Sequence, residues 1–105
     1  MPSLHLIEKG EFSENLKCVD KEKNEWESGF WAIVPDTAQR LVGGTIHLHA
    51  AQDRRSHFGG DILGFRVATE DAHKGRVVFR FRATPDGRDV RAGPDNWSQE
   101  KKFVW

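Results

Sequence analysis

Residues 41–49 read LVGGTIHLH, and residues 56–67 read SHFGGDILGFRV. Each stretch contains a pair of glycines followed by alternating apolar and polar residues, which is typical of a short strand entered through a turn. The loop between the two stretches is polar and carries several side chains that can bind a ligand: Gln52, Arg54, Arg55 and Ser56. The sequence therefore predicts two neighbouring strands with a chemically rich loop between them.

Alternation along the strands predicts which side chains lie in the core. Within residues 45–49 the aliphatic side chains point to one side and the histidines to the other, so the aliphatic side chains are expected inside. The same alternation in residues 61–67 and 76–82 extends the inner set to Ile46, Leu48, Leu63, Phe65, Val67, Val77, Phe79 and Phe81. The outer set is mostly polar or basic: Thr45, His47, His49, Ile62, Arg66, Arg76, Val78, Arg80 and Arg82. Gly64 falls on the outer face, where its missing side chain permits a close approach of another backbone.

An apolar run and a short capped segment form the middle of the chain. Residues 29–34 read GFWAIV and end at Pro35, which is typical of a strand buried on both faces, so we expect it at the centre of the sheet. Residues 36–41 follow, with an acid and a threonine near the start and glycines just beyond the end, which favours a short helix.

The two ends of the chain carry weaker strand signals. Residues 3–8 alternate loosely and predict an edge strand, followed by a turn at residues 9–11. Residues 12–27 are expected to be irregular, with one further strand at residues 16–19, and residues 99–105 predict a last strand. The total of about five to seven short strands with one helix, without βαβ alternation, predicts a mainly β fold, a small barrel of mixed topology. Closing the sheet also removes apolar edges.

Length and composition limit the class of protein. A chain of 105 residues is expected to form one domain, spanning residues 1–105. Cys18 is the only cysteine, which excludes an intrachain disulfide and a four-thiolate zinc site and favours a reducing, cytoplasmic setting. The N-terminal residues lack the layout of a signal peptide, and no apolar run approaches membrane-spanning length, so no export and no membrane association are expected.

The charges cancel in total but not along the chain. Acids prevail in residues 8–27 and arginines in residues 54–91, while the formal net charge is zero. A neutral total disfavours binding to an extended nucleic-acid duplex. The arginines therefore form either a solvated sheet face or a patch for phosphates and carboxylates. The candidates for phosphate contact are Arg54, Arg55, Arg80 and Arg82, together with the backbone amides of Gly59 and Gly60.

The order of these elements resembles the PUA-like superfamily, and within it the EVE and ASCH domains. The resemblance covers about residues 28–83 and rests on the apolar strand with Trp31, the short helix that ends at Gly43 and Gly44, and the strands at residues 45–49 and 60–67. It implies a compact β-barrel that binds RNA or DNA, in several families by accepting a modified or flipped base into a pocket. Where the family more often has Gly-Asp, this chain has Gly43-Gly44.

Tryptophans and histidines supply further candidate contacts. Trp26 and Trp97 lie in polar or loop-like contexts where a ring can stack on a planar group, whereas Trp31 also suits a core. His47 and His49 can hydrogen-bond a ligand or chelate a metal, but an HxH pair alone is a weak metal motif, and no metal or other cofactor is expected. The expected ligand-binding residues are Trp26, Trp31, His47, His49, Gln52, Ser56, Arg66 and Trp97.

No catalytic residue is predicted. Ser56 and His57 are adjacent in the chain, so their side chains point apart, and no nucleophile elbow is present. Cys18 lies in an acidic stretch, which disfavours its thiolate.

The expected function is a small binding module for a nucleotide, a modified base or a nucleic-acid segment, held in a groove lined by aromatic, arginine and histidine side chains. One alternative is a protein-interaction or structural module that uses the arginine face. A second alternative is a small metal-assisted hydrolytic enzyme based on His47, His49 and Asp61. The sequence leaves the oligomeric state open.

Overall fold

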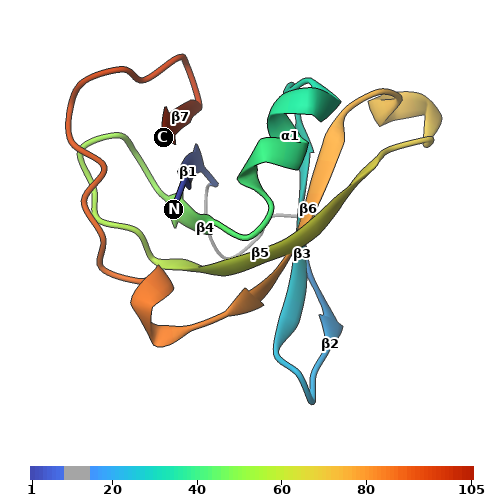
Figure 1. Ribbon diagram of the computed structural model, residues 1–105, viewed down its shortest axis with the longest axis horizontal. Coiled ribbons are helices and arrows are strands. Elements are labelled where there is room, and N and C mark those ends of the chain that lie inside the picture. The colour runs from blue at the N-terminus through green and yellow to red at the C-terminus, as the bar shows by residue number, and fades with distance from the viewer. Residues whose placement is uncertain (9–14) are drawn as a thin grey trace.

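The structure, a computed structural model, describes residues 1–8 and 15–105 (Figure 1). Its strands are β1 (Ser3–Ile7), β2 (Leu16–Asp20), β3 (Glu25–Trp31), β4 (Thr45–His49), β5 (Phe58–Val67), β6 (Val77–Ala83) and β7 (Lys101–Val104). Its helical segments are α1 (Pro35–Leu41) and two 3₁₀ turns, η2 (Asp71–His73) and η3 (Pro85–Gly87). The turn expected at residues 9–11 lies outside the described residues. A mainly β fold with one short helix is thus confirmed.

All seven strands belong to one mixed sheet, in the order β2-β3-β6-β5-β4-β1-β7. Only the β1–β4 pair is parallel, and the other neighbouring pairs are antiparallel. The sheet begins at β2 and ends at β7, and within the described residues no pairing joins these two strands. The expected closure into a ring of strands is therefore not seen in the described part of the chain.

The core lies on the sheet face that α1 covers. Pro35 stands at the first turn of this helix, where its missing N–H costs nothing, and the helix buries Ala38 and Leu41. The cluster that they join is apolar throughout: Leu4, Leu6, Trp31, Ile33, Ala38, Leu41, Ile46, Leu48, Ile62, Val77, Phe79, Phe81 and Ala83. The expected inner positions of β4 and β6 are thus confirmed, and Val78 is buried as well.

Strand β5 departs from the expected alternation. The β5–β6 register shifts between Ile62 and Gly64, which marks an irregularity of the β-bulge kind. The shift puts Ile62 and Leu63 on the faces opposite to those expected, so Ile62 is buried while Leu63 is 39% exposed. Val67, the last residue of β5, lies opposite Val77 on the expected face but is 41% exposed. The predictions for Ile62 and Leu63, and that of a buried Val67, were therefore wrong. Phe65 is half-buried and packs against the core, as expected, whereas Gly64 faces open space and meets no second backbone.

Two strands occupy places that the sequence did not predict. β1 was expected at an edge but lies between β4 and β7, where its middle residues are buried. The strand expected at residues 29–34 begins earlier, at Glu25, and lies next to the edge strand β2 instead of at the centre. The strand expected within residues 16–19 is confirmed as β2.

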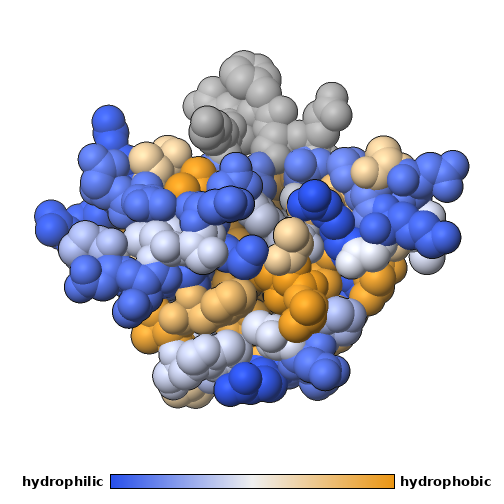
Figure 2. Space-filling model, turned by 90° about the horizontal axis from the view of Figure 1, so that it is seen from above, coloured by the Kyte–Doolittle hydropathy of each residue, from blue (hydrophilic) through white to orange (hydrophobic). Residues whose placement is uncertain are grey.

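Figure 2 shows one face of the molecule, on which hydrophilic and exposed apolar residues lie side by side. The large apolar side chains that are exposed include Val34, Val104 and Trp105. Within the described residues, no helix is both long enough and apolar enough to cross a membrane.

Candidate functional site

The outer face of β4 is covered, which the sequence did not predict. His47 and His49 were expected to be partly exposed, yet they are 6% and 0% exposed. His5 of β1, 4% exposed, joins them, and its ring stacks on that of His47 with centroids 4.9 Å apart. Trp97 packs edge-on against His5 and His49. We call His5, His47 and His49 the histidine cluster.

The cluster is buried because the loop after η3 folds back over it. This loop connects η3 to β7 and runs along one side of the sheet (Figure 1). It is anchored by Ser56, whose hydroxyl donates to Gly87 O at 2.8 Å and accepts the Val90 N–H at 2.9 Å. The Ser56 backbone adds two more bonds, to Asp89 and Val90. Ser56, expected to contact a ligand, is therefore buried and engaged in holding this loop.

Hydrogen bonds fix the proton positions in the cluster. His49 Nδ1 lies 2.8 Å from Arg54 O, and because a carbonyl only accepts, this nitrogen carries the proton. His49 Nε2 then accepts from His5 Nδ1–H at 2.9 Å. By the same reasoning His47 Nδ1–H donates to Gly87 O at 3.2 Å, and its Nε2 accepts from the Thr45 hydroxyl at 3.1 Å.

Burial keeps these imidazoles neutral. The pKa of His5 is lowered from 6.5 to about 3, first by burial and then by the neighbouring His47, His49 and Lys102. Burial also lowers the pKa of His47 and of His49, against the opposing effect of their hydrogen bonds to backbone carbonyls. The cluster is thus a set of neutral, hydrogen-bonded rings at neutral pH.

The ring nitrogens of His47 and His49 are all engaged in these hydrogen bonds. In the part of the chain that the structure describes, no group of three or more His, Cys, Asp or Glu side chains is arranged to hold a metal ion. The histidine cluster therefore has the character of a structural network.

A pocket of about 320 Å³ lies beside the histidine cluster. We call it the arginine pocket, and its lining residues are Gln52, Asp53, Arg54, Arg91, Ala92, Gly93 and Pro94. Its backbone is bonded to the residues behind it: Arg54 O accepts from His49, and Gly93 O accepts the Trp97 indole N–H at 2.9 Å. The Lys102 ammonium donates to Ala92 O. The pocket wall is thus held in place by the buried network.

The arginines of the chain differ in their partners. Arg55 pairs with Asp89, and Arg66 pairs with Glu27 and Glu70. By contrast, neither Arg54 nor Arg91 forms an ion pair with a carboxylate within residues 1–8 and 15–105. The two cations that line the arginine pocket are therefore available for an anion from outside.

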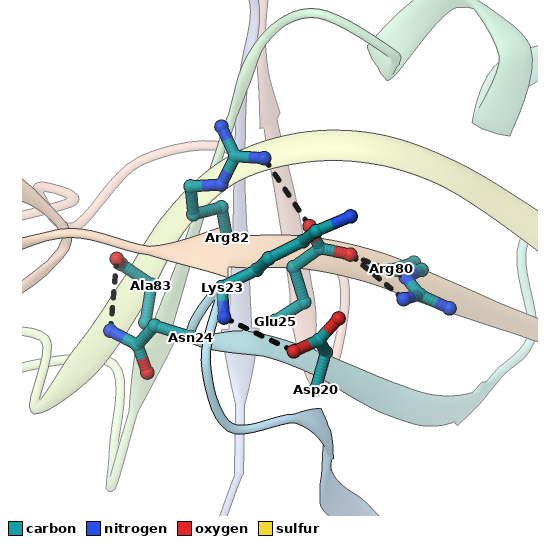
Figure 3. A network of polar contacts seen from close by, with 7 residues as sticks. All are labelled: Asp20, Lys23, Asn24, Glu25, Arg80, Arg82 and Ala83. Carbon is teal, nitrogen blue, oxygen red and sulfur yellow. Dashed lines mark hydrogen bonds and ion pairs between the residues drawn. The ribbon is translucent and has the colours of Figure 1, made fainter.

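Arg80 and Arg82, both expected to contact phosphate, instead meet at one carboxylate (Figure 3). Arg80 lies 2.8 Å from Glu25 Oε1 and Arg82 lies 3.2 Å from Glu25 Oε2. Glu25 is buried, and its hydrogen bond from Arg80 is the main reason that its pKa is lowered. Antiparallel pairing puts Glu25 directly opposite Arg82. Much of the arginine face of the sheet is therefore neutralised by glutamates.

The other residues predicted to contact a ligand lie apart from one another in the structure. Trp31 belongs to the core, where its indole N–H donates to Ser28 Oγ. Trp26 lies on β3 and packs against Phe58, away from the arginine pocket lining. Gly59 and Gly60 are buried within β5, pair with its neighbouring strands and do not line the arginine pocket. Only Gln52 and Arg54 of the predicted set line the arginine pocket.

Sequence reasoning missed His5, Arg91 and Lys102. His5 reaches the cluster because β1 pairs with β4 in parallel, which puts His5 directly opposite His47. Lys102 joins from β7, where it is directly opposite His5. Arg91 lies in the polar loop before β7, and the excess of arginines in residues 54–91 was the one signal that pointed to it.

Comparison with protein-family models, with curated proteins and with solved structures finds no match to this chain.

Proposed function

We propose that this protein is a small binding module for a phosphorylated ligand, with a nucleotide as the preferred candidate, held in the arginine pocket. The observation that carries the proposal is that Arg54 and Arg91 line this pocket without a carboxylate partner in the described chain, whereas Arg55, Arg66, Arg80 and Arg82 are paired. A guanidinium matches two phosphate oxygens with two parallel N–H groups.

Other features of the pocket narrow the ligand class. Its volume of about 320 Å³ suits one small ligand. Asp53 on the same rim repels a polyanion and accepts hydrogen bonds from hydroxyl or amino groups, which a nucleotide carries on its sugar and base. Gln52 lines the pocket as well, and its amide is held by a bond to Gln99 O. These features favour a single nucleotide over an extended nucleic acid.

The alternatives receive less support. A basic interaction face requires free arginines on the sheet, but Arg66, Arg80 and Arg82 are paired with Glu25, Glu27 and Glu70. A metal-assisted enzyme requires ligand nitrogens that His47 and His49 use internally. The resemblance to the PUA-like superfamily and the cytoplasmic location stay predictions.

Calorimetric titration tests the proposal with AMP, ATP and inorganic phosphate as ligands. We expect the Arg54→Gln and Arg91→Gln variants each to bind about tenfold more weakly, since each loses a charge-assisted contact. Arg76→Gln is the matched control, because it removes the same charge from a residue that does not line the pocket. Equal weakening in the Arg76 variant, or no binding of any of the three ligands by the unaltered protein, would contradict the proposal.

A further inference from the structure

A second pocket, of about 290 Å³, lies at the start of β5. We call it the Phe58 pocket, and its lining residues are Asn24, Phe58, Ala83, Thr84, Pro85 and Arg88. It shares no lining residue with the arginine pocket. Among these lining residues are an aromatic ring, a cation and a fixed amide.

We propose that the Phe58 pocket binds a small planar aromatic carboxylate, whose ring stacks on Phe58 while its carboxylate pairs with Arg88. The proposal goes beyond the nucleotide function and does not depend on it. Each part of it rests on a separate contact.

The Phe58 ring is held firmly and has one face toward Arg88. Trp26 and Phe81 pack against it in edge-to-face geometry, with ring centroids 5.0 and 5.8 Å away. Such edge-to-face contacts fix the plane of an aromatic ring. The guanidinium carbon of Arg88 lies over the ring, 5.4 Å from the centroid. A planar ligand therefore meets a pre-oriented stacking surface beside a cation.

Arg88 remains available for a carboxylate. Within residues 1–8 and 15–105 it forms no ion pair, and its side chain is exposed. The guanidinium carbon of Arg88 is also farther from its ring than that of Arg40, which lies 4.3 Å from the Trp105 centroid. The guanidinium of Arg88 is thus near the ring without closing onto it, and its N–H groups are free to pair with an anion.

Asn24 supplies a directed polar contact. Its Oδ1 accepts the Trp26 indole N–H at 2.9 Å, and its Nδ2 donates to Ala83 O at 3.3 Å (Figure 3 shows the second bond). These two bonds fix which end of the amide is which. One N–H and one lone pair remain, and they can bond a ring nitrogen or a ring substituent of the ligand.

Backbone bonds also hold the lining residues Thr84, Pro85 and Arg88. The Thr84 N–H donates to Gly59 O at 3.1 Å, and the Arg88 N–H donates to Pro85 O at 3.2 Å. Gly87 packs so closely on Gly59 that a Cβ there would lie 2.2 Å from the Gly59 oxygen. The η3 turn that precedes Arg88 is therefore anchored to β5, and little order has to be imposed when a ligand binds.

The indole N–H signal of Trp26 in a ¹H–¹⁵N spectrum reports directly on this pocket, since it is bonded to Asn24 and its ring touches Phe58. Trp26→Phe identifies the signal. Nicotinate and benzoate should shift it with a dissociation constant on the order of 1 mM, as expected for ligands of so few atoms. Nicotinamide and cyclohexanecarboxylate, which lack the charge and the aromatic ring respectively, should bind at least about tenfold more weakly.

Variants separate the parts of the proposal. Arg88→Gln should weaken nicotinate about tenfold and leave nicotinamide unchanged, because only the carboxylate contact is lost. Phe58→Leu should weaken the binding of both nicotinate and nicotinamide. If this variant does not fold, comparing benzoate with cyclohexanecarboxylate on the unaltered protein still tests whether the ligand ring stacks. Arg54→Gln, in the other pocket, should change nothing.

Equal shifts with nicotinate and nicotinamide, or an Arg88→Gln variant that binds nicotinate normally, would overturn the proposal. So would the absence of any shift at about ten times the expected dissociation constant. Because these ligands carry no phosphate, failure here leaves the proposed nucleotide site intact, and failure of nucleotide binding leaves this site intact.

Discussion

His5 Nδ1 lies 2.9 Å from His49 Nε2, so a buried bond between two imidazoles joins β1 to β4. The two strands pair in parallel, with His5 opposite His47, and the His5 ring stacks on that neighbour as well. One ring thus connects the other two. Because Lys102 is directly opposite His5 on β7, an added proton on His5 would lie beside an existing positive charge.

Acid should therefore destabilise the fold. The pKa values of His5, His47 and His49 are lowered in the folded chain, that of His5 from 6.5 to about 3. The unfolded chain takes up these protons first, so stability that is present above about pH 6.5 is lost as the pH falls toward the folded pKa values. Each histidine lowers the unfolding free energy by up to about 1.4 kcal/mol per pH unit. Urea unfolding between about pH 8 and pH 5 measures this slope.

The control for this pH dependence is a second histidine variant. His5→Gln should reduce the slope, since it removes one group with a lowered pKa. His73→Gln is the matched comparison, since it removes a histidine outside the cluster. An equal slope in the unaltered protein and in the His5 variant would show that the cluster does not govern acid stability.

Ser56→Ala should loosen the loop that covers the histidine cluster. The change removes the partner of the Val90 N–H and one of the two donors to Gly87 O, both of which meet the buried hydroxyl. Gly87 O keeps its bond from His47, but leaving the Val90 N–H unpaired should cost about 1–3 kcal/mol in the free energy of unfolding. Urea denaturation measures the loss, and Ser98→Ala, at an exposed position, provides the comparison. Equal stability of the two variants would contradict the anchoring role of Ser56.

Alternation predicted side-chain positions correctly where a strand keeps its register. The inner residues of β6, Val77, Phe79 and Phe81, are all fully buried, and so are Ile46 and Leu48 of β4. The prediction failed in β5, because the shift between Ile62 and Gly64 reverses the faces and leaves no mark in the hydrophobic pattern.

The other wrong predictions concern residues whose surroundings are set by segments far away in the sequence. The sequence marks His47 and His49 as the polar face of a strand, but their burial depends on a loop about 40 residues later and on the parallel partner β1. Likewise, the pairing of Arg80 and Arg82 with Glu25 follows from the β3–β6 register. The local sequence pattern contains neither the strand order nor the register. Of the residues expected to contact a ligand, only Gln52 and Arg54 therefore line the arginine pocket.

Glu25→Gln should release two arginines at once. Both guanidiniums now meet this buried carboxylate, so its loss should lower the urea midpoint and increase retention on a polyanion such as heparin. Glu22→Gln makes the same change in net charge at an exposed turn residue, and its retention should rise less. If heparin retention rises equally in both variants, Glu25 does not mask the arginine face.

Gly60→Ala should prevent folding, whereas Gly64→Ala should not. A Cβ at Gly60 would lie 1.8 Å from the Arg82 carbonyl oxygen, and this backbone is fixed by the β5–β6 pairing, so it cannot move aside. The cost should be at least about 3 kcal/mol, the upper part of the range for overpacking. A Cβ at Gly64 meets nothing within 4 Å, so alanine there should be neutral or stabilise by about 0.4–1 kcal/mol through the unfolded chain. Thermal unfolding followed by circular dichroism compares the two, and a folded Gly60→Ala protein with an unchanged midpoint would contradict the close approach of β5 and β6.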